Sequence, residues 1–219
     1  KSKWIRPVIW LLSILSLARI PIAINAEELS TLPYSNSSTV SSQPEAWFPF
    51  DGTWTFTGGP HKTDPGEGDY IQEAVDFAPY YNTSGWIRSA ISGKVHIDGD
   101  CIFVDYDRDG NLNTGWAAFH CHIANLQVTN GQVVARGDKL AAPYYADGTA
   151  NHGHFGFQYN GAHQEADGMV LCGWQVHSSG PDYEGYLDKT GESRINKGQN
   201  VDSCYTSGSE DNTPPTIEF

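Results

Sequence analysis

Short apolar runs, separated by glycine, asparagine and aspartate, follow one another through most of the chain. Runs rich in β-branched and aromatic residues lie at residues 93–97, 101–106, 116–123, 154–159 and 169–176. Such runs between turn residues are typical of β-strands, and no stretch keeps a helical period with capping residues. The pattern predicts a mainly β fold: an antiparallel sheet with a groove along one face and few short helices.

The beginning of the chain has the pattern of a secretion signal. Basic residues precede the apolar run from Val8 to Leu17, and the small residue Ala26 is suited to a cleavage site. A membrane anchor is disfavoured, because Arg19 and Pro21 interrupt a run that is already too short to span a bilayer. We therefore interpret residues 1–26 as a signal peptide and expect a secreted protein, extracellular or periplasmic.

Two segments of linker composition flank the predicted domain at residues 46–205. Residues 27–45 are rich in serine, threonine and asparagine, which indicates a linker or a short pro-segment. Residues 206–219 include Asp-Asn-Thr-Pro-Pro-Thr and are interpreted as a C-terminal linker. The net charge of −13 argues against nucleic acid as a partner. We expect a monomer that is not embedded in a membrane.

Two His-x-His runs carry the strongest chemical signal. They are His120-Cys121-His122 and His152-Gly153-His154, which together hold four of the eight histidines. Because side chains alternate along a strand, residues i and i+2 share a face, so each run can aim two imidazoles into one cleft. Imidazole is a common zinc ligand and the usual proton carrier near neutral pH.

A third histidine and a carboxylate upstream complete a metal-ligand set. His61 ends a Gly-Gly-Pro-His run, and Asp76 lies between Val75 and Phe77 in a strand-like segment. An inward carboxylate in such a segment needs a cation, whereas the acidic residues at 64, 67 and 69 lie in a Gly/Pro-rich loop. A catalytic zinc takes three protein ligands and leaves one position open, which His61, Asp76 and one later histidine can satisfy.

The order of these motifs resembles the lysostaphin/LytM-type zinc metallopeptidases. Gly-Gly-Pro-His, Val-Asp-Phe-Ala, a His-x-His-Ile run and a final His-x-His-Phe follow one another as in that family. The similarity is closest to its beta-lytic, staphylolysin-like branch of secreted enzymes that cut glycine-containing cell-wall peptides. The resemblance implies the LytM/lysostaphin-type peptidase fold, with a substrate groove on one face of the sheet.

The resemblance assigns roles residue by residue. His61, Asp76 and His154 match the ligands of a single catalytic zinc, and His122 and His152 match two histidines that line the reaction centre. The implied function is a secreted endopeptidase that hydrolyses glycine-containing bonds in peptidoglycan cross-link peptides, or in Gly-rich proteins. The tyrosine that the beta-lytic branch presents near its active site has no evident counterpart, because Asn200 falls near that position.

Two alternatives remain. A relative without activity could only bind cell wall or activate another hydrolase, although such proteins usually lose ligands. The run His120-Cys121-His122-Ile123 also resembles the copper-binding signature of multicopper oxidases, in which the cysteine is a copper ligand. That signature continues with a further histidine where this chain has Leu126, which disfavours copper.

Four cysteines predict two disulfides with three possible pairings. Cys101 and Cys121 flank a turn almost symmetrically, so a cross-strand bridge is geometrically reasonable and leaves Cys172 with Cys204. Strand alternation then points Cys121 away from the cleft that His120 and His122 face. In the beta-lytic branch the cysteine that resembles Cys101 pairs just before the final His-x-His, where this chain has no cysteine, so the pairing stays open.

The turn that begins at Asp105 has oxygen ligands at alternating positions, as calcium loops do. The candidate ligands are Asp105, Asp107, Asp109, Asn111 and Asn113. The twelfth position is a tryptophan and the flanks read as strands, so this is no EF-hand; it is similar to the hairpin calcium loops of integrin-type repeats. A solvated acidic turn is the alternative.

Overall fold

The computed structural model describes residues 42–62, 71–80, 85–144 and 151–205. These residues form strands and turns without an α-helix, and every strand pair is antiparallel, which confirms the predicted mainly β fold. Within the same residues there is no helix long and apolar enough to cross a membrane. The segments interpreted as signal peptide and C-terminal linker, and most of the segment at 27–45, lie outside the described residues.

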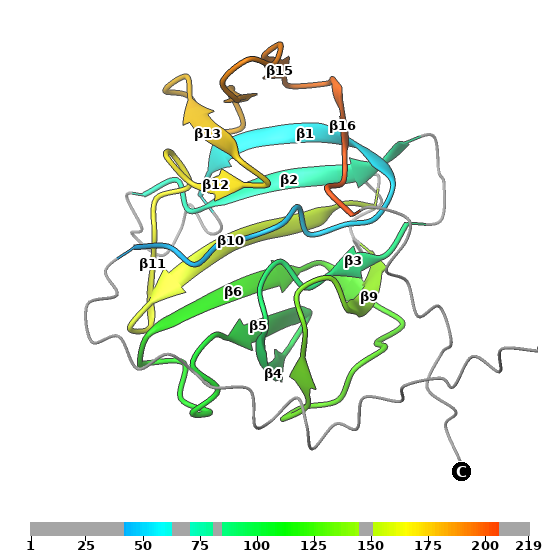
Figure 1. The fold of residues 1–219 in the computed structure, drawn as a ribbon, viewed down its shortest axis with the longest axis vertical. Coiled ribbons are helices and arrows are strands. Elements are labelled where there is room, and N and C mark those ends of the chain that lie inside the picture. Colours follow the sequence, from blue (N-terminus) through cyan, green and yellow to red (C-terminus); the bar gives the residue numbers. More distant parts are fainter. Residues whose placement is uncertain (1–41, 63–70, 81–84, 145–150, 206–219) are drawn as a thin grey trace, which may run out of the picture. The chain divides into compact units, whose positions relative to one another are not determined.

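A nine-stranded antiparallel sheet forms the body of the protein (Figure 1). Its strands are β1 (Thr53–His61), β2 (Ala74–Pro79), β4 (Gly93–Asp98), β5 (Cys101–Asp105), β6 (Trp116–Cys121), β8 (Val133–Val134), β10 (Gly153–Tyr159), β11 (Ala162–His163) and β16 (Asn200–Asp202). They are ordered β16-β1-β2-β10-β6-β5-β4-β8, and β11 pairs with β10. The sheet thus brings together strands that are distant in sequence.

Two smaller sheets complete the fold. One contains β12 (Val170–Leu171), β13 (Trp174–Ser178), β14 (Gly185–Asp188) and β15 (Ile195–Asn196), and the other contains β3 (Ile87–Arg88), β9 (Lys139–Pro143) and β7 (Ile123–Ala124). The predicted run at 169–176 is therefore two strands, because Cys172 and Gly173 turn the chain with φ of 53° and 79°. The predicted run at 116–123 is likewise divided at His122, where φ is 61°.

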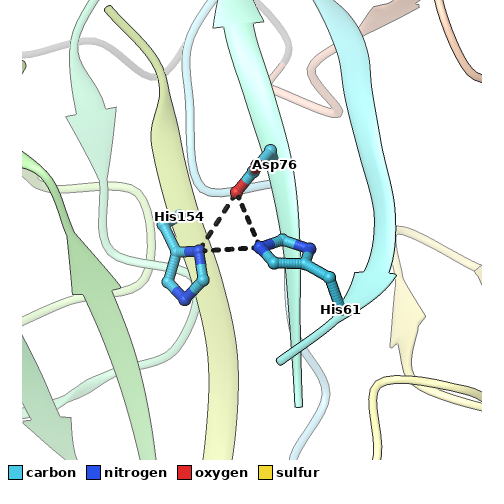
Figure 2. Close-up of side chains that lie close together, drawn as sticks. All are labelled: His61, Asp76 and His154. Atoms are coloured by element: carbon cyan, nitrogen blue, oxygen red, sulfur yellow. Dashed lines mark hydrogen bonds and ion pairs between the residues drawn. The ribbon is translucent and has the colours of Figure 1, made fainter. Parts of the chain in front are cut away.

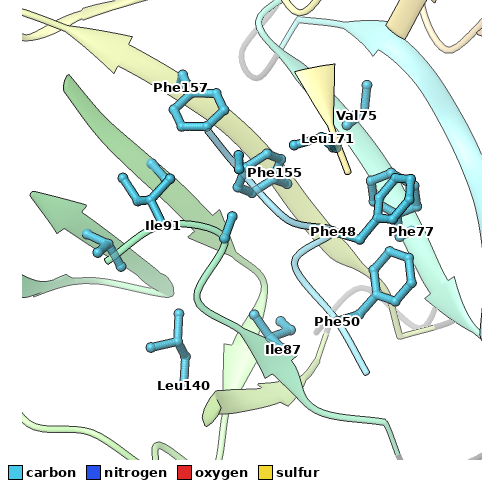
Figure 3. Close-up of a cluster of buried hydrophobic side chains, with 14 of the residues drawn as sticks. Phe48, Phe50, Val75, Phe77, Ile87, Ile91, Leu140, Phe155, Phe157 and Leu171 are labelled. Atoms are coloured by element: carbon cyan, nitrogen blue, oxygen red, sulfur yellow. The ribbon is translucent and has the colours of Figure 1, made fainter. Parts of the chain in front are cut away.

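The hydrophobic core lies on one face of the large sheet (Figure 3). Phe77 from β2 and Phe155 and Phe157 from β10 contribute aromatic rings to it. The segment before β1 covers this face: Phe48 and Phe50 are buried, with ring centroids 5.7 and 5.0 Å from that of Phe77. Aromatic side chains bury large apolar areas, so this cluster supplies much of the driving force that fixes the sheet.

A row of directly paired residues crosses the opposite face of the sheet. Asp76 in β2 pairs with His154 in β10, His154 pairs with Cys121 in β6, and Cys121 pairs with Cys101 in β5. Directly paired residues in an antiparallel sheet point to the same side. This row therefore defines the face of the sheet on which polar side chains gather, away from the aromatic core.

Candidate metal centre

Three buried side chains from three neighbouring strands converge on one point (Figure 2). His61 comes from the end of β1, Asp76 from β2 and His154 from β10. His154 Nδ1 lies 3.1 Å from Asp76 Oδ1 and 3.2 Å from His61 Nε2, and His61 Nε2 lies 3.5 Å from Asp76 Oδ1. The structure thus brings together the three residues that the sequence proposes as metal ligands.

The dimensions of this triangle fit a tetrahedral zinc ion. Zinc bonds to imidazole nitrogen and carboxylate oxygen are about 2.0–2.1 Å long, so neighbouring ligand atoms of a tetrahedron lie about 3.3 Å apart. The three observed separations, 3.1, 3.2 and 3.5 Å, bracket that value. Two nitrogens and a carboxylate oxygen are also the ligand atoms that zinc prefers in catalytic sites.

The orientation of the His61 ring is fixed from two sides. Its Nδ1 lies 2.8 Å from the carbonyl oxygen of Gly59. When the proton is on Nδ1, this nitrogen donates a hydrogen bond to that oxygen, and Nε2 then carries the lone pair that faces Asp76. The ring of Tyr183 stacks on the His61 ring, with centroids 4.0 Å apart and planes 19° apart. Tyr183 is a residue of the site that the sequence did not reveal, because it lies in the turn before β14 and no local motif marks it.

The protonation states of the triangle suit a cation. Burial lowers the pKa of His61 below its usual value, and the nearby Asp76 carboxylate opposes that shift only in part. Burial opposes ionisation of Asp76, but the hydrogen bond with His154 and the charges of the neighbouring histidines hold the pKa of its carboxyl below its usual value. A neutral imidazole and an ionised carboxylate are the forms that bind metal.

The two histidines expected at the reaction centre lie beside the triangle. The ring centroids of His122 and His152 are 4.8 Å apart, and the His122 ring is 5.3 Å from that of His154. His152 Nε2 lies 3.9 Å from Asp76 Oδ2, and His122 Nδ1 lies 3.3 Å from Asp100 Oδ2. Burial lowers the pKa of His122, as does the nearby His154, while the hydrogen bond with Asp100 opposes the shift.

The expected orientation of the first His-x-His run is wrong. Cys121 pairs directly with His154 and therefore points to the metal side of the sheet, not away from it. His120 points to the opposite side, where it is 1% exposed, lies against Phe155 at 5.1 Å between ring centroids and accepts a hydrogen bond from Ala90 N–H at 3.3 Å. His122 reaches the metal side because its left-handed backbone conformation ends the alternation.

The same orientation rules out the copper interpretation of this run. His120 and His122 lie on opposite sides of β6, so the two imidazoles cannot bind one metal cluster. Cys121 is bonded to Cys101 and has no thiolate to offer. The second disulfide joins Cys172 to Cys204. Both bridges match the pairing that the cross-strand argument favours.

Two consecutive glycines allow the close approach of the strands at the site. A Cβ atom at Gly58 would lie 2.9 Å from Asp76 Oδ2, and one at Gly59 would lie 2.6 Å from the backbone carbon of Glu184. Real Cβ contacts are longer than this. Gly59 faces backbone atoms that cannot rotate away, so this position needs glycine, whereas a Cβ at position 58 would press on the Asp76 side chain. The Gly-Gly of the Gly-Gly-Pro-His motif thus has a steric reason.

The acidic turn lies at the far end of β5 and β6 from the metal row. Oxygen atoms of Asp105, Asp107 and Asp109 lie within 4.8 Å of one another, which makes the turn a second group of potential metal ligands. Asn111 Oδ1 accepts a hydrogen bond from Asn113 N–H at 3.1 Å.

Comparison with known proteins supports the fold. No family model and no curated protein matches the chain. Among solved structures, the M23 metalloprotease Pseudoalterin from the deep sea is similar with a TM-score of 0.61 at 19% identity, over 73% of this chain and 99% of that one.

Two further solved structures are less similar, with TM-scores below 0.5. The SpoIIQ–SpoIIIAH pore-forming complex matches with a TM-score of 0.43 at 14% identity, over 56% of this chain and 89% of that one. The catalytic domain of the M23 protein EnpA from Enterococcus faecalis matches with 0.38 at 17% identity, over 51% and 88%. The similarity to Pseudoalterin shows that the chain has the fold of an M23 metalloprotease.

Proposed function

We propose that this protein is a zinc metallopeptidase of the lysostaphin/LytM (M23) family that hydrolyses glycine-containing peptide bonds in bacterial cell-wall peptidoglycan. The observation that carries the proposal is the triangle of His61, Asp76 and His154, with separations of 3.1 to 3.5 Å between its ligand atoms. Two further histidines beside it supply the proton chemistry that peptide hydrolysis needs. The fold similarity to an M23 metalloprotease agrees with this reading.

His61, Asp76 and His154 would hold a zinc ion, which would polarise the peptide carbonyl and lower the pKa of water toward neutrality. The remaining chemistry belongs to the protein. His122 and His152 can donate hydrogen bonds to the oxyanion that develops on the carbonyl oxygen, and one of them can transfer a proton to the leaving amine. The Asp100 carboxylate at 3.3 Å favours a proton on Nδ1 of His122 and so directs Nε2 toward the reacting groups.

Secretion belongs to the same proposal. Two disulfides, Cys101–Cys121 and Cys172–Cys204, support an oxidising compartment such as the extracellular space or the periplasm. A groove for a glycine-rich strand of substrate stays a prediction.

The test combines metal content with cleavage of a pentaglycine peptide. We expect about one zinc per chain by mass spectrometry, and cleavage that is lost on chelation and restored by zinc. His154→Ala should lose both the metal and the activity. His122→Ala should keep the metal and lose activity by roughly 100-fold or more.

The matched control is His177→Gln, which changes a histidine on β13 that stacks on Tyr186, outside the ligand triangle. It should keep both zinc and activity. Zinc without cleavage of any glycine peptide would contradict the peptidase and favour an inactive binding protein. Absence of zinc from correctly folded protein would contradict the metal site itself.

A further inference from the structure

The turn between β5 and β6 concentrates negative charge outside the zinc triangle. Asp105 ends β5, and Asp107 and Asp109 follow it in the turn, with oxygen atoms of all three within 4.8 Å of one another. Acidic groups on a surface turn usually spread apart in water. Here the backbone holds them together, because Gly110 N–H donates to Asp105 Oδ2 at 2.8 Å and Asn111 N–H donates to Asp109 Oδ1 at 2.7 Å.

Asp105 gives an independent indication that a cation belongs in the turn. The residue is 0% exposed, and its Oδ1 atom is buried with no hydrogen-bond partner among the residues that the structure describes. Burial of a carboxylate oxygen with no donor is costly, and such oxygens are usually paired with a cation or coordinate a metal. The second oxygen of Asp105 is the one that accepts from Gly110, so the turn satisfies only half of this carboxylate.

The electrostatics of the turn also favour a cation at this point. Burial, and next the adjacent Asp107, raise the pKa of Asp105 to about 7. Oxygen atoms of the Asp105 and Asp107 carboxylates lie within 4.8 Å of one another, so a cation held between them offsets their mutual repulsion. Lys94 pairs with Asp105 across β4 and β5, and its ammonium group lies beside Gly110, but it provides one positive charge against three carboxylates.

The chemistry of the ligands selects the ion. The cluster offers carboxylate oxygens and no nitrogen or sulfur, which suits a hard cation and not zinc. A turn that supplies oxygens at alternating positions can provide the six to eight ligands at 2.3–2.6 Å that calcium takes, with water completing the shell. We propose that the turn binds one calcium ion through Asp105, Asp107 and Asp109.

The bound ion would stabilise the strands that carry the metal centre. The turn is already joined to the sheet, because Gln158 Nε2 donates to Leu112 O at 3.0 Å and Gly115 N–H donates to Asn160 Oδ1 at 2.9 Å. Asn113 Oδ1 lies against Gly161, so the neighbouring turn contacts the loop as well. At their other ends, β5 and β6 carry Cys101 and Cys121, and His122 follows. Calcium therefore orders the hairpin beside the reaction centre without contacting substrate.

The test measures calcium binding on the full, zinc-loaded protein, with CaCl₂ alone as the probe. We expect calcium to raise the midpoint of thermal unfolding saturably, by roughly 5 °C, with about one site per chain by calorimetry. Terbium should bind in its place and luminesce on excitation of Trp116, which lies next to the turn. Zinc content should not change.

Variants distinguish a site from general screening of charge. Asp107→Asn combined with Asp109→Asn should abolish the calcium response, whereas the control Asp188→Asn, an exposed carboxylate on β14, should keep it. Asp105→Asn should lose calcium binding yet be at least as stable as the wild type without calcium, because the amide relieves repulsion from Asp107. An equal response in all variants, or none in the wild type, would overturn the proposal. Neither result depends on peptidase activity.

Discussion

At the scale of the residue, the backbone of His122 decides which side chains face the metal centre. A strand that continued through this position would send His122 to the same side as His120, into the aromatic core. Its φ of 61° turns the ring to the metal side instead. A left-handed conformation is unfavourable for a residue other than glycine by about 1 kcal/mol, a cost commonly accepted at functional sites.

His120, the residue that remains in the core, should make the protein sensitive to mild acid. Burial lowers the pKa of His120 to about 4, below the value near 6.5 of the unfolded chain. Between about pH 6.5 and 4, His120 is protonated in the unfolded state but neutral in the folded state. The free energy of unfolding therefore has its full value above this window and decreases as the pH falls through it. The loss attributable to His120 amounts to about 3 kcal/mol.

Urea unfolding of zinc-free protein at pH 6.5, 5.5 and 4.5 checks this. His120→Gln should be less stable at pH 6.5 but lose less stability toward pH 4.5 than the wild type. His177→Gln, as the control, should keep the slope of the wild type. Parallel curves for the wild type and His120→Gln would contradict the assignment.

At the scale of the element, β1 departs from regular pairing in order to deliver His61. Its register with β2 shifts between Phe56 and Gly58 and again between Gly58 and His61. The backbone of His61 therefore pairs with Ala74, while its Nε2 atom lies 3.5 Å from Asp76 Oδ1. Such irregularities re-aim side chains and are common near active sites. The glycines at 58 and 59 let the distorted strand lie against Asp76 and against β14.

Replacement of Gly59 by alanine should therefore damage both stability and the metal site. Its Cβ would meet the backbone of Glu184 at 2.6 Å and of Gly185 at 2.7 Å, and backbone atoms cannot rotate away. We expect a loss of about 2–4 kcal/mol in the free energy of unfolding, with weaker zinc binding because Gly59 O orients His61.

Gly153→Ala is the matched control in β10, because its Cβ would make ordinary contacts with Ile87 and Trp54 at 3.5 and 3.6 Å. It should change stability by less than about 1 kcal/mol. Chemical denaturation and a zinc competition assay measure the two effects. Equal stability of the two variants would contradict the steric argument.

At the scale of the whole molecule, each disulfide should have a different effect. Cys172–Cys204 joins residues 32 apart in sequence and tethers the sheet formed by β12, β13, β14 and β15. Cys101–Cys121 joins residues 20 apart and lies in the row of paired residues that contains His154. Removing either pair as a double alanine variant should lower the free energy of unfolding by about 3 kcal/mol. The Cys101/Cys121 variant should also lower kcat, because these cysteines adjoin Asp100 and His122, and the other variant should not. Equal kcat values in folded samples of both would contradict this distinction.

The sequence predicted the mainly β fold and identified the histidines and the aspartate that converge, because turn residues, strand periodicity and motif order are local signals. The sequence-based prediction placed Cys121 and His120 on the wrong faces of the sheet. The bend at His122 is a backbone conformation, and the residue types at this point do not indicate it. Tyr183 was missed for a related reason. Its stacking on His61 depends on how the sheet formed by β12, β13, β14 and β15 packs against β1, and no sequence motif marks such a tertiary contact.

The pairing of β16 with β1 has a consequence for how the protein is made. Among the described residues, β1, which carries His61, is the first strand, and its residues 53–55 pair with β16, the last strand of that part of the chain. Until residues 200–202 have been synthesised, residues 53–55 of β1 lack this partner strand, and unpaired strand edges are surfaces on which chains aggregate. We therefore expect a truncated chain that lacks β16 to aggregate more readily than the intact chain, which light scattering of the two purified proteins would measure.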